Sequence, residues 1–186
     1  LVLLGLVAPV RAQAAPPSPA REYQIKAVFL LNFTRFVEWP PRMFAAPDAP
    51  FVIGILGEDP FGHYLDDAVR KEFIDRHPIV LRRYHSSDDL AGCHLLFISR
   101  SETPRLGEIL RRVQGRDILT VSDAPQFAAS GGMIGLVKRA DKVRLQINLA
   151  VAKQTDLAIS SKLLRPSEII GNWRKDTLPW FDPHPL

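Results

Sequence analysis

Cysteine is almost absent from this sequence, since Cys93 is the single one among 186 residues. No intrachain disulfide can form, although many exported proteins rely on such bridges. Cys93 stands at the entry to an apolar run, so we expect a small, buried side chain there. The five histidines show neither helical i, i+4 spacing around a glutamate nor a cysteine partner. This pattern indicates no zinc site, and we expect neither a metal nor another cofactor.

Recognisable catalytic motifs are also missing. No serine lies in a Gly-x-Ser-x-Gly elbow, and Gly54, Gly57 and Gly62 have the wrong spacing for a dinucleotide-binding turn. The adjacent carboxylates Asp66-Asp67 and Asp88-Asp89 would point in different directions on a helix, so caps and solvated faces explain them better. A triad assembled from distant residues stays open as the weakest alternative. We therefore expect a binding or regulatory protein rather than an enzyme.

A strong charge of either sign is lacking as well. Lys and Arg number 24 against 20 Asp and Glu, which gives a net charge of +4. Basic residues are spread along the chain without interleaved aromatics, so nucleic-acid binding is a poor hypothesis. The composition, 46% hydrophobic and 24% charged, is that of a globular protein, and the length suits one domain.

No apolar run reaches the roughly twenty residues that a membrane-spanning helix requires. The run over residues 1–10 precedes Ala12-Gln13-Ala14, the small-x-small pattern that signal peptidase reads. We interpret residues 1–14 as the remnant of a signal peptide and residues 15–20 as a Pro-rich linker. A buried N-terminal core element is the alternative. The mature protein is therefore expected to be exported and soluble.

Short apolar runs alternate with amphipathic segments through most of the chain. The strand-like runs cover residues 51–57, 79–84, 94–99 and 118–122. Helical spacing covers residues 61–73 and 104–113 between them. Strands that are apolar on both faces are typical of a parallel sheet covered by helices. Further runs at 133–138 and 143–148 predict an antiparallel hairpin, and residues 149–164 predict a final helix.

We therefore predict a single α/β domain over residues 21–165. An N-terminal helix precedes a mostly parallel, helix-covered sheet with the rhythm of a Rossmann fold, and the antiparallel hairpin plus helix close the domain. Residues 166–186 are rich in Pro and Trp and lack periodicity, so we assign them to a C-terminal tail.

The N-terminal helix contains the stretch FLLNFTRFVEWPP at residues 29–41. At 100° per residue, its apolar side chains fall within one arc, which consists of Phe29, Leu30, Phe33, Phe36 and Val37. We expect this arc to pack on the sheet. Asn32, Arg35 and Glu38 lie on the opposite side. Together with Trp39 they are our candidate surface for a partner or ligand.

Several stretches resemble, in the right order, those of the YfiR-type family of periplasmic regulators. They are KAVFLLNFTRFVEWP (26–40), IGILGEDPF (53–61), CHLLFI (93–98), LTVSD (119–123) with Phe127, GGMI (131–134), and Ile147-Asn148 followed by ISSKLL (159–164). The aromatic helix and the GGMI turn are specific in combination. The resemblance covers about residues 21–165.

This resemblance implies a signalling role in the periplasm. The best-known family member represses an inner-membrane diguanylate cyclase by binding its periplasmic domain, and an OmpA-like outer-membrane lipoprotein captures it to relieve the repression. Cyclic-di-GMP and biofilm formation then follow envelope stress. That member is a homodimer, and small aromatic or nucleotide-like ligands have been proposed for the fold. We expect a periplasmic regulator that binds such a cyclase, or a sensor kinase, by protein–protein interaction.

Two features depart from the family. Characterised members hold loops with intrachain disulfides, so redox control of that kind should be absent from a chain with Cys93 alone. Where relatives tend to have glycine after the first sheet helix, this chain has Asp75. A left-handed turn that suits glycine is therefore left to an aspartate.

The alternative function is a periplasmic small-molecule sensor without a cyclase partner. Doubly wound α/β folds form crevices at the carboxyl ends of their strands. Ser99 and Ser101 would lie at the rim of such a crevice, with residues 57–59 and Ser122-Asp123 beside them. A nucleotide, an amino acid or another aromatic ligand would bind there.

Overall fold

The computed structural model describes residues 19–171. The predicted signal-peptide remnant at 1–14 lies outside the described residues, as do residues 15–18 of the linker and 172–186 of the tail. Pro19 and Ala20, which the composition assigned to the linker, are the first residues of helix α1 (Pro19–Phe36). Proline suits a helix start because the first turn needs no hydrogen bond from its nitrogen.

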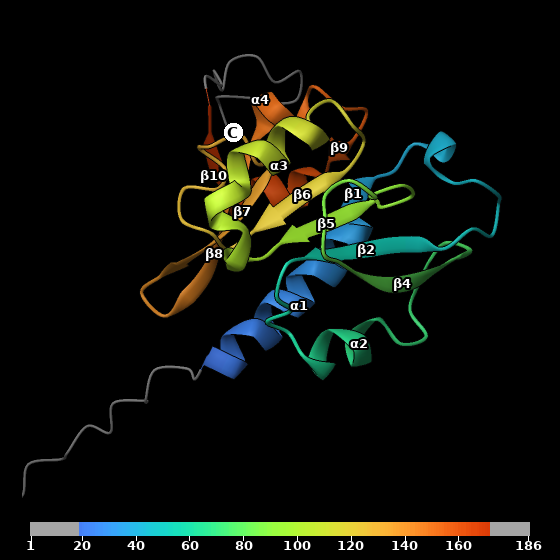
Figure 1. Ribbon diagram of the computed structural model, residues 1–186, viewed down its shortest axis with the longest axis horizontal. Helices are drawn as coiled ribbons and strands as arrows, with labels where there is room; N and C mark the ends of the chain where they lie inside the picture. Colours follow the sequence, from blue (N-terminus) through green and yellow to red (C-terminus); the bar gives the residue numbers. More distant parts are fainter. Residues whose placement is uncertain (1–18, 172–186) are drawn as a thin grey trace, which may run out of the picture.

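An eight-stranded sheet runs through the described part of the molecule in the order β10-β8-β7-β6-β5-β2-β4-β3 (Figure 1). Its strands are β2 (Phe51–Leu56), β3 (Phe73–Ile74), β4 (His77–Tyr84), β5 (Leu95–Ile98), β6 (Leu119–Ser122), β7 (Ile134–Arg139), β8 (Lys142–Asn148) and β10 (Glu168–Ile170). Neighbours from β4 through β2, β5 and β6 to β7 are parallel, whereas β3 and β8 run antiparallel to β4 and β7. The chain thus has the predicted α/β fold with a mostly parallel sheet.

The remaining elements are short apart from α1. They are α2 (His63–Val69), α3 (Leu106–Val113), α4 (Leu149–Ala152), α5 (Ser161–Leu164), the 3₁₀ helices η1 (Pro41–Met43) and η2 (Arg100–Arg105), and strands β1 (Val37–Glu38) and β9 (Ala158–Ile159). β1 and β9 form a separate antiparallel pair.

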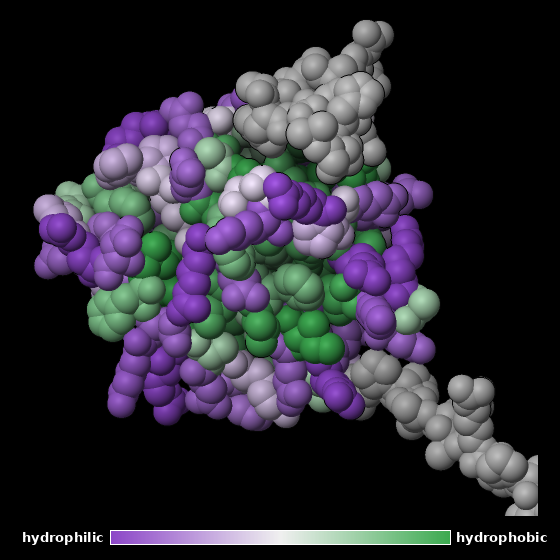
Figure 2. Space-filling model, turned by 180° about the vertical axis from the view of Figure 1, so that it is seen from behind, coloured by the Kyte–Doolittle hydropathy of each residue, from purple (hydrophilic) through white to green (hydrophobic). Residues whose placement is uncertain are grey.

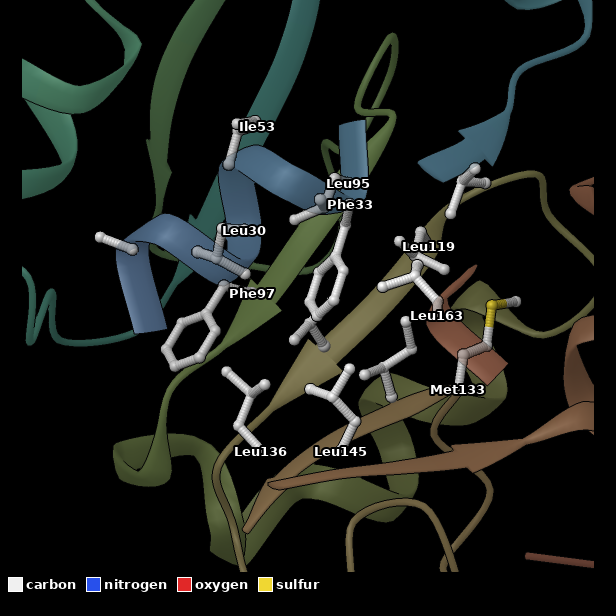
Figure 3. Close-up of a cluster of buried hydrophobic side chains, with 14 of the residues drawn as sticks. Leu30, Phe33, Ile53, Leu95, Phe97, Leu119, Met133, Leu136, Leu145 and Leu163 are labelled. Carbon is white, nitrogen blue, oxygen red and sulfur yellow. The ribbon is translucent and has the colours of Figure 1, made fainter. Parts of the chain in front are cut away.

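Helices cover both faces of the sheet because its central strands are buried on both sides. Leu30 and Phe33 of α1 lie over one face, against strand residues such as Leu95 (Figure 3). α3 covers the opposite face, where Ile109 packs in the same cluster as Leu96. α1 and α3 therefore hold the sheet between them, as the alternating sequence pattern predicts.

The buried stripe of α1 is rotated relative to the predicted arc. Phe33 is fully buried, but Phe29 and Phe36 are only half-buried, and the side chain of Lys26 is buried on the same stripe as Phe33. α1 also ends at Phe36, because the next two residues, Val37–Glu38, extend to pair with β9.

Two apolar side chains of α1 point away from the core. Ile25 and Val28 are 40% and 55% exposed. Seen from behind, the molecule shows apolar side chains across its middle, with polar side chains around them (Figure 2). The exposed apolar side chains of α1 are therefore available for further packing.

The predicted helix over residues 149–164 is wrong. α4 ends after one turn, where the Thr155 hydroxyl donates to the carbonyl of Ala152. The chain then extends as β9 because β1 offers it a strand partner. Ser160 caps the short α5 by accepting from the amide of Lys162.

Two other boundaries differ from the predicted ones. The helix expected over 61–73 is limited to α2, because the chain turns at Lys71 with a φ of 64° and Phe73–Ile74 become β3. Asp75 makes the following turn with a φ of 52°, so an aspartate does adopt the left-handed conformation there. At the other end of the domain, residues 168–170, which composition assigned to the tail, pair in parallel with β8.

Candidate functional site: a groove at the amino edge of the sheet

A groove of about 610 Å³ opens where α1 ends, beside the amino-terminal ends of β2 and β4. Its walls come from two segments that are distant in sequence, the one after α1 and the β3–β4 hairpin. It is lined by Thr34, Arg35, Val37, Glu38, Trp39, Pro41, Phe44, Phe73, Ile74, Asp75 and His77. The groove is therefore at the opposite edge of the sheet from the carboxyl ends where doubly wound folds usually bind ligands.

Trp39 is held firmly at this groove. Its indole N–H donates to the carbonyl of Thr34 at 2.9 Å, which satisfies one of the free carbonyls at the end of α1. Its ring meets that of Phe51 edge to face, with the centroids 4.7 Å apart. Trp39 thus anchors the end of α1 to β2 while it lines the groove.

Three charged side chains line the groove. Arg35 Nη2 lies 2.6 Å from Glu72 Oε2, so its charge is already balanced. Glu38 and Asp75 are exposed, and neither has an ion-pair partner among residues 19–171. The groove therefore carries two uncompensated carboxylates beside one balanced pair.

A stack of aromatic rings and histidines lies beneath the groove. Phe44 stacks against both His77 and His94, with ring centroids 3.7 and 4.8 Å away. Phe51 stacks on His94 at 4.8 Å. His94 is 3% exposed, and its Nδ1 accepts from the amide of Val52 at 3.1 Å. Burial lowers the pKa of His94 to about 4, so the ring is neutral in the folded protein at neutral pH.

From this buried histidine we predict that the free energy of unfolding decreases in acid. Between pH 6.5 and about 4 the unfolded chain binds a proton at His94 that the folded chain excludes. The contribution of the neutral ring to the free energy of unfolding is therefore fully present above pH 6.5. It is lost as the pH falls through this window, and the loss is on the order of 3 kcal/mol. His94→Asn keeps an acceptor for Val52 and should flatten the dependence of unfolding free energy on pH, measured by urea titration from pH 7.5 to 4.

The exposed His85 supplies the matched control for this measurement. His85→Asn should leave the pH dependence as in the wild type, because an exposed side chain keeps nearly the same surroundings when the chain unfolds. An unchanged slope in His94→Asn would contradict the role assigned to His94.

The structure brings three of the six predicted site residues together. Arg35, Glu38 and Trp39 line the groove. Asn32 is half-buried on α1 and is not among the lining residues, while Ser99 and Ser101 lie at the carboxyl edge of the sheet. Their site roles stay predictions.

The carboxyl edge of the sheet is occupied by internal hydrogen bonds. The Ser99 hydroxyl accepts from the amide of Ser101 at the start of η2, and the Ser101 hydroxyl accepts from the amide of Glu58 at 3.0 Å. The Ser122 hydroxyl donates to the carbonyl of Ile98. These serines hold the strand ends together.

A buried ionic cluster joins α1 to the same edge, and the sequence pattern did not reveal it. Lys26 Nζ lies 2.6 Å from Asp123 Oδ2 and 2.6 Å from Glu22 Oε1. The Tyr23 hydroxyl donates to Asp123 Oδ2 at 2.9 Å, and burial followed by the Asp123 charge raises the pKa of Tyr23 to about 12. Arg100 Nε lies 3.2 Å from the same oxygen. In the sequence, the only sign that Lys26 is buried is its position on the same face of the helix as Leu30.

Cys93 is buried, as predicted. Its thiol donates to the carbonyl of Leu95 at 3.4 Å, and burial raises its pKa to about 12. It is therefore a protonated, inert side chain. In the part of the chain that the structure describes, no three potential metal ligands cluster, and no helix is long and apolar enough to span a bilayer.

A family model described as YfiR/HmsC-like matches residues 23–168. This match runs from within α1 to the first residue of β10, and it includes the other strands of the eight-stranded sheet and both walls of the groove. A comparison with curated proteins found no match. Because the family model covers most of the chain and the fold is the predicted one, the chain belongs to the YfiR/HmsC-like family.

Proposed function

We propose that this chain is a periplasmic regulatory protein that controls a membrane diguanylate cyclase by binding its periplasmic domain. Family membership over residues 23–168 is the observation that carries the proposal. The protein acts on cyclic-di-GMP, and hence on biofilm formation, through protein–protein contact rather than catalysis. The signal-peptide pattern at residues 1–14 supports export to the periplasm.

The groove at the amino edge supports a binding role. It combines apolar side chains such as Trp39 and Phe73 with the charged side chains of Arg35 and Glu38. A central apolar surface with a polar rim is the usual composition of a protein interface. The exposed Ile25 and Val28 of α1, on another part of the surface, support a homodimer contact. An OmpA-like lipoprotein that captures the regulator completes the proposed pathway.

Deletion of the gene tests this function. We expect cellular cyclic-di-GMP, measured by mass spectrometry, to rise severalfold in the deletion strain, since a repressor is lost. Affinity capture from detergent-solubilised membranes should recover a cyclase with a periplasmic domain, and a sensor kinase is the alternative prey. Complementation with the wild-type gene is the control. Unchanged cyclic-di-GMP together with an empty capture would overturn the proposal.

A small-molecule sensor is the second candidate, favoured by the volume of the groove. About 610 Å³ lies within the range of ligand pockets, roughly 300 to 1,000 Å³. A nucleotide or aromatic amino acid at a hundredfold its dissociation constant would stabilise the pure protein by about 2.7 kcal/mol in a thermal-shift screen. Such a result, with no change in cyclic-di-GMP on deletion, would favour the sensor over the cyclase regulator.

A further inference from the structure

The uncompensated charge of the groove is negative. Glu38 and Asp75 project from its two walls, and neither carboxylate meets a cation within residues 19–171. Arg35 is the single lysine or arginine that residues 19–171 contribute to the lining, and it is balanced by Glu72 at 2.6 Å. A ligand that enters the groove therefore gains most if it brings positive charge.

The groove also presents apolar side chains to solvent. Phe73 is 54% exposed, and it is the only aromatic residue among the exposed large hydrophobic residues of the part of the chain that the structure describes. Trp39 faces the same groove from the other wall. Phe44 is already stacked against His77 and His94. Phe73 and Trp39 therefore supply the apolar contacts that a ligand can use.

Two strand edges flank the groove. β3 is the terminal strand of the eight-stranded sheet, and β1 pairs with β9 on one side alone in the described sheets. Residues of both strands line the groove. A free strand edge can pair with an extended peptide, whose side chains then point alternately to opposite sides.

We propose that the groove binds an extended basic segment of the partner protein, in which apolar and basic residues alternate. Its apolar side chains contact Trp39 and Phe73, and its Lys or Arg side chains pair with Glu38 and Asp75. This assignment rests on the proposed function, because it identifies the segment by which the regulator recognises its partner.

The probe for this groove is a Lys-Phe-Lys-Phe-Lys peptide that carries fluorescein at its amino terminus and an amide at its carboxyl terminus. Fluorescence anisotropy with the full chain at low salt should show binding that weakens as salt is added. The double variant Glu38→Gln/Asp75→Asn should weaken binding about tenfold and reduce the salt dependence. Glu-Phe-Glu-Phe-Glu, which keeps the aromatic residues and reverses the charge, should not bind.

The matched control changes two exposed acids outside the groove, Glu58→Gln and Asp67→Asn, and should leave affinity unchanged. Equal binding of the acidic peptide, or wild-type affinity in the groove variant, would overturn the proposal. So would stronger binding by a peptide of residues 172–186, which contains Trp173-Arg174-Lys175, because the groove would then belong to the chain's own tail.

Membrane capture separates this inference from the proposed function. If the Glu38→Gln/Asp75→Asn variant captures the cyclase as well as the wild type, the groove assignment fails and the function stands. If the wild type captures no membrane enzyme while the basic peptide binds as expected, the function fails and the chemistry of the groove stands.

Discussion

Replacement of Lys26 by methionine is expected to lower the free energy of unfolding by about 3 to 5 kcal/mol, the range for removing one partner of a buried ion pair. Lys26 Nζ lies 2.6 Å from Asp123 Oδ2, and the two side chains are 2% and 1% exposed. Asp123 Oδ1 has no hydrogen-bond partner within the described residues. Without Lys26, Asp123 therefore retains Tyr23 and the partly exposed Arg100 alone.

The melting temperature should fall by about 6 to 20 °C in the Lys26→Met variant, as measured by calorimetry. Lys138→Met is the matched control, because Lys138 lies 3.9 Å from the same Glu22 yet is 43% exposed. Its cost should stay below about 1 kcal/mol. Adding Asp123→Asn to Lys26→Met should recover part of the loss, since the unpaired charge is removed. Equal effects of the two lysine variants would show that the buried pair is not stabilising α1.

Replacement of Gly132 by alanine is the second change with a large expected effect. A Cβ at this position would lie 2.1 to 2.5 Å from three ring carbons of Phe127. Phe127 is 1% exposed and packs in the core beneath α3, so the ring cannot move into solvent. We expect destabilisation of about 3 kcal/mol, the upper end for overpacking a core, measured by urea unfolding.

Gly107 offers a matched alanine substitution in the same region. No atom lies within 4 Å of a Cβ at Gly107, which is in α3, so Gly107→Ala should stabilise the protein by about 0.5 to 1 kcal/mol. Phe127→Leu combined with Gly132→Ala should cost less than the sum of the two single changes, because the smaller side chain makes room for the methyl group. If the losses of unfolding free energy in the two single variants simply add in the double variant, the contact between residue 132 and the Phe127 ring would be contradicted.

The sequence alone identified the residues of one wall of the groove and missed those of the other wall. Arg35, Glu38 and Trp39 stand within five residues of each other at the end of an amphipathic helix, so one local pattern identified them together. The other wall, with Phe73 and Asp75, is about 35 residues further along the chain. No periodicity relates the two walls, because they meet through the packing of α1 beside α2 and β3.

The incorrect helix over 149–164 has a similar cause. Its apolar residues fit a helical period, but the middle of the segment extends because β1 supplies hydrogen bonds to Ala158–Ile159. A strand of two residues carries no alternation of its own, so its conformation depends on a partner more than 100 residues away in the sequence.

The sequence by itself determined the α/β class, the mostly parallel sheet, the burial of Cys93 and the family. These properties follow from local apolar periodicity and from short motifs, which act over a few residues. Only the tertiary structure decided that Lys26 is buried against Asp123, that Gly132 meets Phe127 and that Glu38 and Asp75 face one groove. Each of these depends on the distance between segments far apart in the chain, and that distance is set by how α1 and the strands pack.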